Sequence, residues 1–144
     1  MKNYLLGSII MLMLNPVVAQ DRDAIVGKWQ SEHGSGMIQI YRNQDKYYGK
    51  LIAIKDPHDS QGKPQLDINN PSAKLRSRPV IGIEILKDLE YKGKGVWDNG
   101  TIYNPKTGKS YSCKMSLLNN NKLDIKGYMG FSFIGKSVNW TRVH

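Results

Sequence analysis

Alternation of apolar and polar residues with a period of two runs through most of this chain and limits what it can fold into. In the stretch YSCKMSL, Tyr111, Cys113 and Met115 would face one side of a strand, while Ser112 and Lys114 would face the other. The stretches GMIQIYR and KLDIKGYMG read in the same way. YYGKLIAIK and PVIGIEIL hold more apolar residues, which is typical of strands covered on both faces. The pattern therefore favours an all-β domain.

Short polar segments separate these apolar stretches and predict tight turns. The candidates are Asn43–Lys46, Gly93–Gly95, Asn104–Lys109 and Asn119–Asn121. Proline presets one dihedral angle of such a turn, whereas glycine and asparagine accept left-handed backbone. Strands at this spacing indicate an antiparallel meander. We predict one up-and-down β-barrel of about eight strands, because a closed barrel leaves no exposed edge.

One segment, residues 56–79, interrupts this succession of predicted strands and short turns. Its four prolines and many polar turn residues rule out a long strand. A loop of this length is uncommon in a compact domain and is usually functional or disordered. Leu66, Ile68 and Leu75 give it side chains to bury, which favours a packed lid over a loose linker. A structural crossover without ligand contact is the alternative.

The first residues predict a signal peptide. Lys2 precedes an apolar run from Tyr4 to Leu14, and small residues lead up to Ala19. The run is shorter than the roughly 20 residues that span a bilayer. No cysteine follows it, so a lipoprotein anchor is not expected. We predict that residues 1–19 are cleaved before Gln20. The remaining domain, residues 20–144, would be periplasmic or secreted and would not span a membrane.

Composition narrows the choice of partners. The 144 residues carry a net charge of +9, but the excess comes from 16 lysines against five arginines. Nucleic-acid readers favour arginine for bidentate contacts, so no nucleic-acid partner is expected. A weak attraction to anionic envelope polymers or lipids remains open. Cys113 is the single cysteine. It is expected to be a small buried apolar residue, with a reactive or dimer-forming thiol as the alternative.

Catalytic and metal-binding signatures do not stand out. The three histidines are far apart in sequence, which does not suit a metal site. Ser31, Glu32 and His33 are adjacent, but neighbours on an extended chain point apart and do not form a triad. We therefore expect no enzyme, no catalytic residue, no metal and no cofactor.

Aromatic residues around two predicted hairpins suggest a ligand site. A barrel of about eight strands has an interior that side chains fill or that holds one small ligand. Aromatic walls with a few polar groups suit such a cavity, whereas ordinary core packing is the alternative. The candidate ligand-binding residues are Trp97, Tyr103, Tyr111, Tyr128 and Phe133, with Asp67 and Arg78 as polar anchors. If the protein were an enzyme after all, Asp67, Arg78 and Tyr103 would be the residues to test.

Both ends of the domain carry tryptophan. Gly27-Lys28-Trp29 stands near the first predicted strand and Trp140-Thr141-Arg142 near the last. This resembles the lipocalin and wider calycin pattern, in which a Gly-x-Trp and an Arg on the closing strand seal the barrel floor. The resemblance implies a barrel closure by Gly27, Trp29, Trp140 and Arg142. Arg142 should pack on Trp29, a contact worth roughly 1–2 kcal/mol when desolvated.

The closer resemblance covers nearly the whole domain. It is to a family of small secreted bacterial proteins catalogued only as a domain of unknown function. Besides Gly27-x-Trp29 and Trp140-Thr141-Arg142, it rests on the stretches GKLI at 49–52, GKP at 62–64, LD at 66–67, NP at 70–71, RPVIG at 78–82, WDNG-x-IYNP-x-x-GK-x-Y at 97–111 and GY-x-G at 127–130. The resemblance implies a lipocalin-like barrel and export, and it implies no activity, ligand or catalytic residue. The usual lipocalin disulfide cannot form here.

Asn99-Gly100-Thr101 and Asn139-Trp140-Thr141 fit glycosylation sequons. They lie in or beside predicted strands of a bacterial protein, so we discount them.

Two hypotheses of function follow. The first is an exported protein that binds a small hydrophobic or amphipathic molecule in the barrel cavity, with the 56–79 loop as a lid. The second is a cell-envelope interaction module with a filled barrel. Its basic face for anionic polymers or lipids would consist of Lys106, Lys109, Lys114, Lys122 and Lys126.

Overall fold

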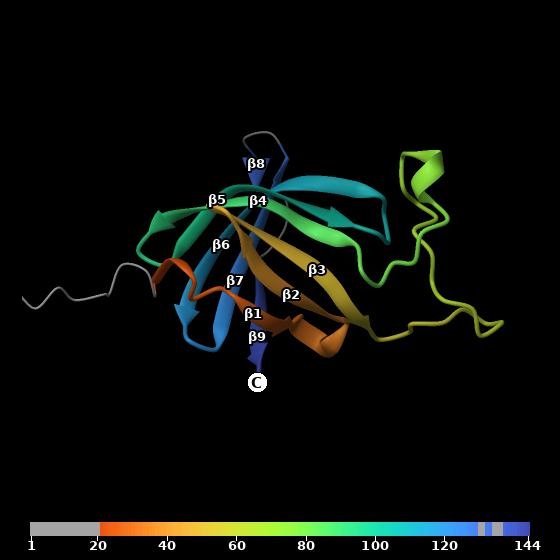
Figure 1. Cartoon of the computed structure of the whole chain (residues 1–144), viewed down its shortest axis with the longest axis horizontal. Helices are drawn as coiled ribbons and strands as arrows, with labels where there is room; N and C mark the ends of the chain where they lie inside the picture. The colour runs from red at the N-terminus through yellow and green to blue at the C-terminus, as the bar shows by residue number, and fades with distance from the viewer. Residues whose placement is uncertain (1–20, 130–131, 134–136) are drawn as a thin grey trace, which may run out of the picture.

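A computed structural model describes residues 21–129, 132–133 and 137–144, so the predicted signal peptide lies outside the described residues. Nine strands are described (Figure 1). They are β1 (Gly27–Gln30), β2 (Gly36–Asn43), β3 (Lys46–Ile54), β4 (Glu84–Gly93), β5 (Val96–Asn104), β6 (Lys109–Asn119), β7 (Lys122–Met129), β8 (Ser132–Phe133) and β9 (Val138–Val143). Two short 3-10 helices accompany them, η1 (Glu32–Gly34) and η2 (Ala73–Leu75).

The strands form one antiparallel sheet that closes on itself. Their order is β6-β5-β4-β3-β2-β1-β9-β7-β8, and a further pairing of β6 with β7 completes the ring. Eight strands therefore make the barrel, while β8 pairs with β7 alone among the described strands. The predicted all-β barrel is confirmed, and the four predicted turns connect β2–β3, β4–β5, β5–β6 and β6–β7.

The alternation seen in the sequence decides which side chains fill the interior. On β6 and its partner β7, Met115 is paired with Ile125, and both are buried. On β1 and β2, Trp29 is paired with Ile38, and both are fully buried. Gly49 of β3 is paired with Leu86, whose side chain occupies the space that a Cβ at position 49 would take. One apolar core results, to which each of the eight barrel strands contributes inward-facing residues.

The connection from β3 to β4, residues 55–83, is named here the β3–β4 loop. The sequence predicted a strand over PVIGIEIL, residues 79–86, but β4 begins only at Glu84. Gly82 has a left-handed φ of +100°, which an extended strand does not allow. The Gly82 N–H donates to the Leu51 carbonyl, and the Leu51 N–H donates to the Ile83 carbonyl. The first half of the predicted strand is therefore loop, tied to the end of β3 by two hydrogen bonds.

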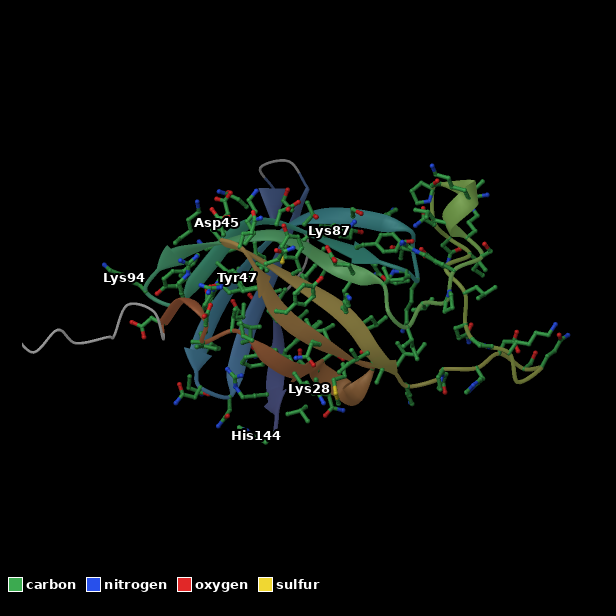
Figure 2. All side chains as sticks on the ribbon, viewed as in Figure 1. Lys28, Asp45, Tyr47, Lys87, Lys94 and His144 are labelled. Carbon is green, nitrogen blue, oxygen red and sulfur yellow. The ribbon has the colours of Figure 1, made fainter. Side chains whose placement is uncertain are left out.

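The two ends of the barrel differ. Residues 21–26 lie at one end, and the β3–β4 loop extends from the other (Figure 1). In Figure 2, Tyr47 lies toward the N-terminal end, and side chains of the loop stand out on both sides of its ribbon. Within the described part of the chain, no helix combines the length and the apolar character needed to cross a bilayer.

Candidate functional site

Arg142 organises the end of the barrel that residues 21–26 cover, named here the sealed end. Its guanidinium carbon lies 4.3 Å from the centroid of the Trp29 ring. Its nitrogens donate hydrogen bonds to the carbonyls of Val26 at 3.0 Å, Asn120 at 2.7 Å and Ala24. The predicted packing of Arg142 on Trp29 is therefore present, and the same side chain also holds two carbonyls of the N-terminal segment.

Gly27 and Trp140 belong to the same end. Gly27 has φ +138°, and a Cβ there would lie 2.8 Å from Nη1 of Arg142. Glycine thus allows both the backbone angle and the close approach of the guanidinium. Trp140 is buried and is paired with Leu123 of β7. All four residues that the sequence assigned to barrel closure lie in the β1–β9–β7 region.

Trp97 also lies at the sealed end. Its ring packs against Tyr47, 6.3 Å between centroids, and against Tyr91, 5.2 Å between centroids. Its indole N–H donates to the Arg22 carbonyl at 3.2 Å, and the Tyr47 hydroxyl donates to Asp23 at 2.7 Å. The N-terminal segment is thus held by aromatic side chains as well as by Arg142.

At the opposite end, named here the loop end, a buried carboxylate orders the β3–β4 loop. Asp67 accepts a hydrogen bond from the Tyr103 hydroxyl at 2.5 Å on one oxygen. Its other oxygen accepts from the Asn70 side chain at 2.8 Å and from Nε of Arg78 at 3.0 Å, and Nη2 of Arg78 lies 3.0 Å from the same oxygen as an ion pair. Asp67 is fully buried, and its two oxygens hold partners from the loop itself and from β5. Asp67 and Arg78, the polar anchors that the sequence suggested, thus form an ion pair within the loop.

These contacts change the titration of both partners. Burial alone would raise the pKa of Asp67, but the hydrogen bonds from Tyr103, Asn70 and Arg78 outweigh it and lower the pKa. For Tyr103, burial and the hydrogen bond to Asp67 raise the pKa. The network therefore stays ionised at Asp67 and neutral at Tyr103 around neutral pH.

A second set of contacts fixes the loop to the β5–β6 turn. The Asn69 side chain donates to the carbonyls of Lys106 at 2.9 Å and Pro105 at 3.4 Å. A Cβ on Gly108 would clash with the Asn69 backbone, so this position admits only glycine. The β3–β4 loop is thus packed on the neighbouring turn and is not a loose linker.

The inward face of β6 is buried in its middle and half-buried toward both ends, at Tyr111 near the loop end and at Leu117 near the sealed end. Cys113 and Met115 of β6 are buried, whereas Tyr111, two residues earlier on the same face, is half-buried. Ile102 of β5, the register partner of Tyr111, is half-buried as well. Tyr103 is paired with Ser110 and belongs to the opposite face, where its hydroxyl reaches Asp67.

The structure thus divides the aromatic candidates. Tyr103, Tyr111, Asp67 and Arg78 lie at the loop end, while Trp97 lies at the sealed end. Backbone pairing places Tyr128 opposite Phe133 at the end of β7, and their side chains lie outside the described residues.

Cys113 has the character expected of a core residue. Burial, with a smaller contribution from Asp98, raises the pKa of its thiol to about 12. The thiolate that a reactive cysteine needs is therefore scarce at neutral pH.

The five lysines of the predicted basic face are spread along the barrel. Lys106 and Lys109 lie at the loop end, and Lys122 lies on the turn at the sealed end. Between them, Lys114 and Lys126 are direct register partners on the outer face of β6 and β7. Lys126 also lies 3.9 Å from Asp124.

Two open, polar grooves lie on the outside of the barrel. One, about 390 Å³, is lined by Gln30, Ser31, Glu32, Gly34, Lys122, Asn139 and Thr141. The other, about 380 Å³, is lined by Arg22, Asp45, Lys46, Glu90, Tyr91 and Lys92. Neither groove contains a residue that the sequence proposed as a ligand contact.

Sequence reasoning missed three contributors to these sites. Asn70 completes the Asp67 network, Ile102 shares the inward face with Tyr111, and Tyr47 holds the N-terminal segment. The Asn70-Pro71 pair and the strand register around Tyr111 were visible signals for the first two. Nothing local to Tyr47 indicates its contact with Asp23, 24 residues earlier.

Comparisons with known proteins agree with this fold. Residues 27–142 match a family described as uncharacterized protein conserved in bacteria (DUF2147). A solved structure, described as protein HP1028 from the human pathogen Helicobacter pylori, which belongs to the lipocalin family, is similar with a TM-score of 0.72. The two sequences are 26% identical, over 83% of this chain and 82% of the other. No curated protein matches the sequence.

Proposed function

The chain belongs to the DUF2147 family of bacterial proteins, and from the barrel's geometry we propose that it binds a small, largely apolar molecule at the loop end. The lipocalin-like fold makes small-molecule binding the natural use of the barrel. The observation that carries the proposal is the change in exposure along the inward face of β6. Cys113 and Met115 in the middle of the strand are buried, whereas Tyr111 and its partner Ile102 at the loop end are half-buried, as is Leu117 toward the sealed end. An apolar ligand at the loop end would cover Tyr111 and Ile102.

The residues at the two ends of the barrel then have different roles. Tyr111 and Ile102 supply apolar contact, and the β3–β4 loop covers the site. Asp67 holds the loop rather than the ligand, because its oxygens accept hydrogen bonds from Tyr103, Asn70 and Arg78. Arg78 retains partial exposure of its side chain and is the candidate for contact with a polar end of the ligand. Trp97 belongs to the floor of the barrel.

Export is part of the same proposal. Cleavage before Gln20 would remove residues 1–19 and leave intact the segment 21–26, which Arg142 and Trp97 hold. The mature protein would then act in the periplasm or outside the cell. N-terminal sequencing of the protein from an envelope or medium fraction tests this. A mature chain that starts after Asp23 would contradict it, because the sealing contacts would be lost.

The binding test uses uptake of a fluorescent fatty-acid analogue by the purified protein, with native mass spectrometry to find co-purifying ligand. We expect saturable uptake, and about tenfold weaker binding for Tyr111→Ala, because a buried aromatic contact contributes about 1.5–3 kcal/mol. Leu118→Ala is the matched control, since Leu118 is an exposed apolar residue at the other end of β6. A folded protein that takes up no apolar probe, or a Tyr111→Ala variant that binds as tightly as the parent, would refute the proposal.

A second candidate is an interaction module for anionic envelope polymers, and one pairing favours it. Lys114 and Lys126 face each other across β6 and β7. Like charges directly opposite one another destabilise a sheet, and an anionic partner would offset that cost. Retention on envelope polymers should fall steeply with salt, because exposed charges are screened over about 10 Å at 0.1 M. Retention that is unaffected by salt, or by Lys114→Gln with Lys126→Gln, would exclude this candidate.

A further inference from the structure

The β3–β4 loop contains a small two-stranded ribbon with unusual polarity. Residues 65–67 run beside residues 78–80, joined by hydrogen bonds from the Asp67 N–H to the Arg78 carbonyl and from the Val80 N–H to the Gln65 carbonyl, both 2.9 Å. Leu66 and Pro79 form an isolated bridge between these bonds. Alternation along such a ribbon separates its residues into two sides.

The ribbon buries its carboxylate, while large apolar residues in it and next to it are exposed. Asp67 is 0% exposed and Val80 is 8% exposed, so this side faces the protein. Leu66 of the ribbon is 39% exposed, and Ile68 and Ile81, which directly follow its two strands, are 67% and 42% exposed. These are three of the five large apolar residues that are exposed in the described part of the chain. Apolar groups gathered at one surface, with polar groups around them, mark an interaction site.

The outward side chains are held in place rather than left on a loose segment. Tyr103, Asn70 and Arg78 fix the inner side through Asp67. The Asn69 side chain, next to Ile68, is bonded to the carbonyls of Pro105 and Lys106. Because this framework orders the ribbon, Leu66, Ile68 and Ile81 remain exposed although the loop is packed.

The charge around these residues is positive. Residues 66–81 and the adjoining turn 104–109 contain one acid, Asp67, which is fully buried and paired with Arg78. Their basic residues are Lys74, Arg76, Arg78, Lys106 and Lys109. Arg76 is placed beside the ribbon by its hydrogen bond to the Asn70 carbonyl at 2.7 Å. The nearest acid earlier in the loop is Asp59, whose carboxylate accepts the N–H groups of Gln61 and Lys63 on a separate turn.

We propose that the outer side of this ribbon docks the protein on an anionic lipid bilayer. Leu66, Ile68 and Ile81 would enter the interfacial layer, while the surrounding lysines and arginines contact lipid phosphates. Apolar side chains combined with a basic rim are what an interfacial anchor needs, and each basic residue near an anionic surface adds attraction. A soluble anionic polymer would use the cations but would leave the exposed isoleucines without a role. The proposal does not depend on a ligand inside the barrel.

The test is sedimentation of the purified protein with vesicles of phosphatidylglycerol and phosphatidylethanolamine, compared with vesicles of phosphatidylcholine alone. We expect binding to the anionic vesicles only, weakened by salt. Ile68→Ser should lower the partition coefficient about fivefold, which corresponds to ~1 kcal/mol of apolar burial. Lys106→Gln with Lys109→Gln should lower it about fivefold for each lysine removed, which corresponds to ~1 kcal/mol each.

Two matched controls separate this surface from the rest of the barrel. Leu118→Ser removes another exposed apolar residue, 56% exposed, at the far end of β6. Lys28→Gln with Lys94→Gln removes the same charge from exposed positions on β1 and on the β4–β5 turn. Both controls should bind anionic vesicles within about twofold of the parent if the ribbon is the docking surface, since most of the attraction acts near the membrane.

Several outcomes would overturn the proposal. One is no binding to anionic vesicles by a protein whose circular dichroism shows it to be folded. Another is equal weakening by Ile68→Ser and Leu118→Ser. If the protein binds polyphosphate and Ile68→Ser leaves vesicle binding unchanged, the surface is one for anionic polymers. If Ile68→Ser changes the oligomeric state by light scattering and leaves vesicle binding unaltered, the ribbon is a self-association surface instead.

Discussion

The sealed end offers the sharpest test of how this barrel is stabilised, through the substitution Arg142→Ala. The guanidinium lies over the Trp29 ring and donates to the carbonyls of Ala24, Val26 and Asn120. A cation–π contact contributes roughly 1–2 kcal/mol when desolvated. Each lost hydrogen bond contributes about 1 kcal/mol, and less where water can replace the donor.

Because these contributions share one side chain, they do not add fully, and we expect a loss of about 3 kcal/mol in the free energy of unfolding. For a domain of this size that corresponds to roughly 10 °C in Tm. The assay is urea unfolding followed by circular dichroism and tryptophan fluorescence. Arg142→Lys keeps a cation near Trp29 but cannot reach three carbonyls, so it should recover only part of the loss.

Arg42→Ala is the matched control at the same end of the barrel. Arg42 forms an ion pair with Asp23 at 3.5 Å, with both side chains about two-fifths exposed. Exposed pairs contribute about 0–1 kcal/mol. If Arg142→Ala destabilises the protein no more than Arg42→Ala does, the view that Arg142 holds the N-terminal segment on the barrel is wrong. Apolar ligand binding by the folded Arg142→Ala variant should remain unchanged.

Four further predictions concern the loop end, the core and the sealed end. Tyr103→Phe removes one donor to Asp67, and faster hydrogen exchange in residues 66–80 should reveal a loosened loop, whereas unchanged exchange would contradict the network's role. Asp67 has a lowered pKa in the folded state, so the stability that its ionisation contributes is fully present above the unfolded pKa of about 4 and is lost as the pH falls toward the folded pKa. The free energy of unfolding of Asp67→Asn should therefore lack this part of the pH dependence in acid. Cys113 should react with a disulfide reagent far more slowly in the native protein than in denaturant, because its pKa is about 12 and its side chain is buried, and comparable rates would show an accessible thiol. Gly27→Ala should destabilise the protein by more than ~1 kcal/mol in urea unfolding, because its φ is positive and its Cβ would meet Arg142, and a neutral result would show that the guanidinium can shift freely.

Local pattern was sufficient to predict the strands, because period two is a property of each strand alone. The stretch Tyr111–Leu117 shows this, since its alternation matches the buried Cys113 and Met115 of β6. The contact of Arg142 with Trp29 was also predictable, through a motif at each end of the chain. Hydrogen bonds between residues far apart in the sequence were not predictable in this way. Tyr103 and Asp67 are 36 residues apart, and neither residue's neighbours indicate the other.

The separation of the aromatic candidates between the two ends of the barrel has a simple geometric cause. Trp97 and Tyr103 were grouped because they are close in sequence. However, six residues of an extended strand span about 20 Å, nearly the length of β5. Residues at the two ends of one strand therefore lie at the two ends of the barrel. Grouping by register instead would have joined Tyr111 to Ile102, its partner on the neighbouring strand.

The two ends of the barrel also differ in how far their apolar side chains are buried. This difference predicts where substitutions affect function. At the sealed end the indole N–H groups of Trp29 and Trp97 have protein acceptors, and the rings are buried. Substitutions there should lower stability first. At the loop end the polar groups are equally well paired through Asp67, yet apolar side chains remain exposed on the ribbon and half-buried inside the barrel. Exposed apolar side chains do not stabilise the isolated protein. A partner that covers this apolar surface would explain why the loop holds it exposed. Substitutions of Ile68 or Tyr111 should therefore change binding while leaving the free energy of unfolding nearly constant.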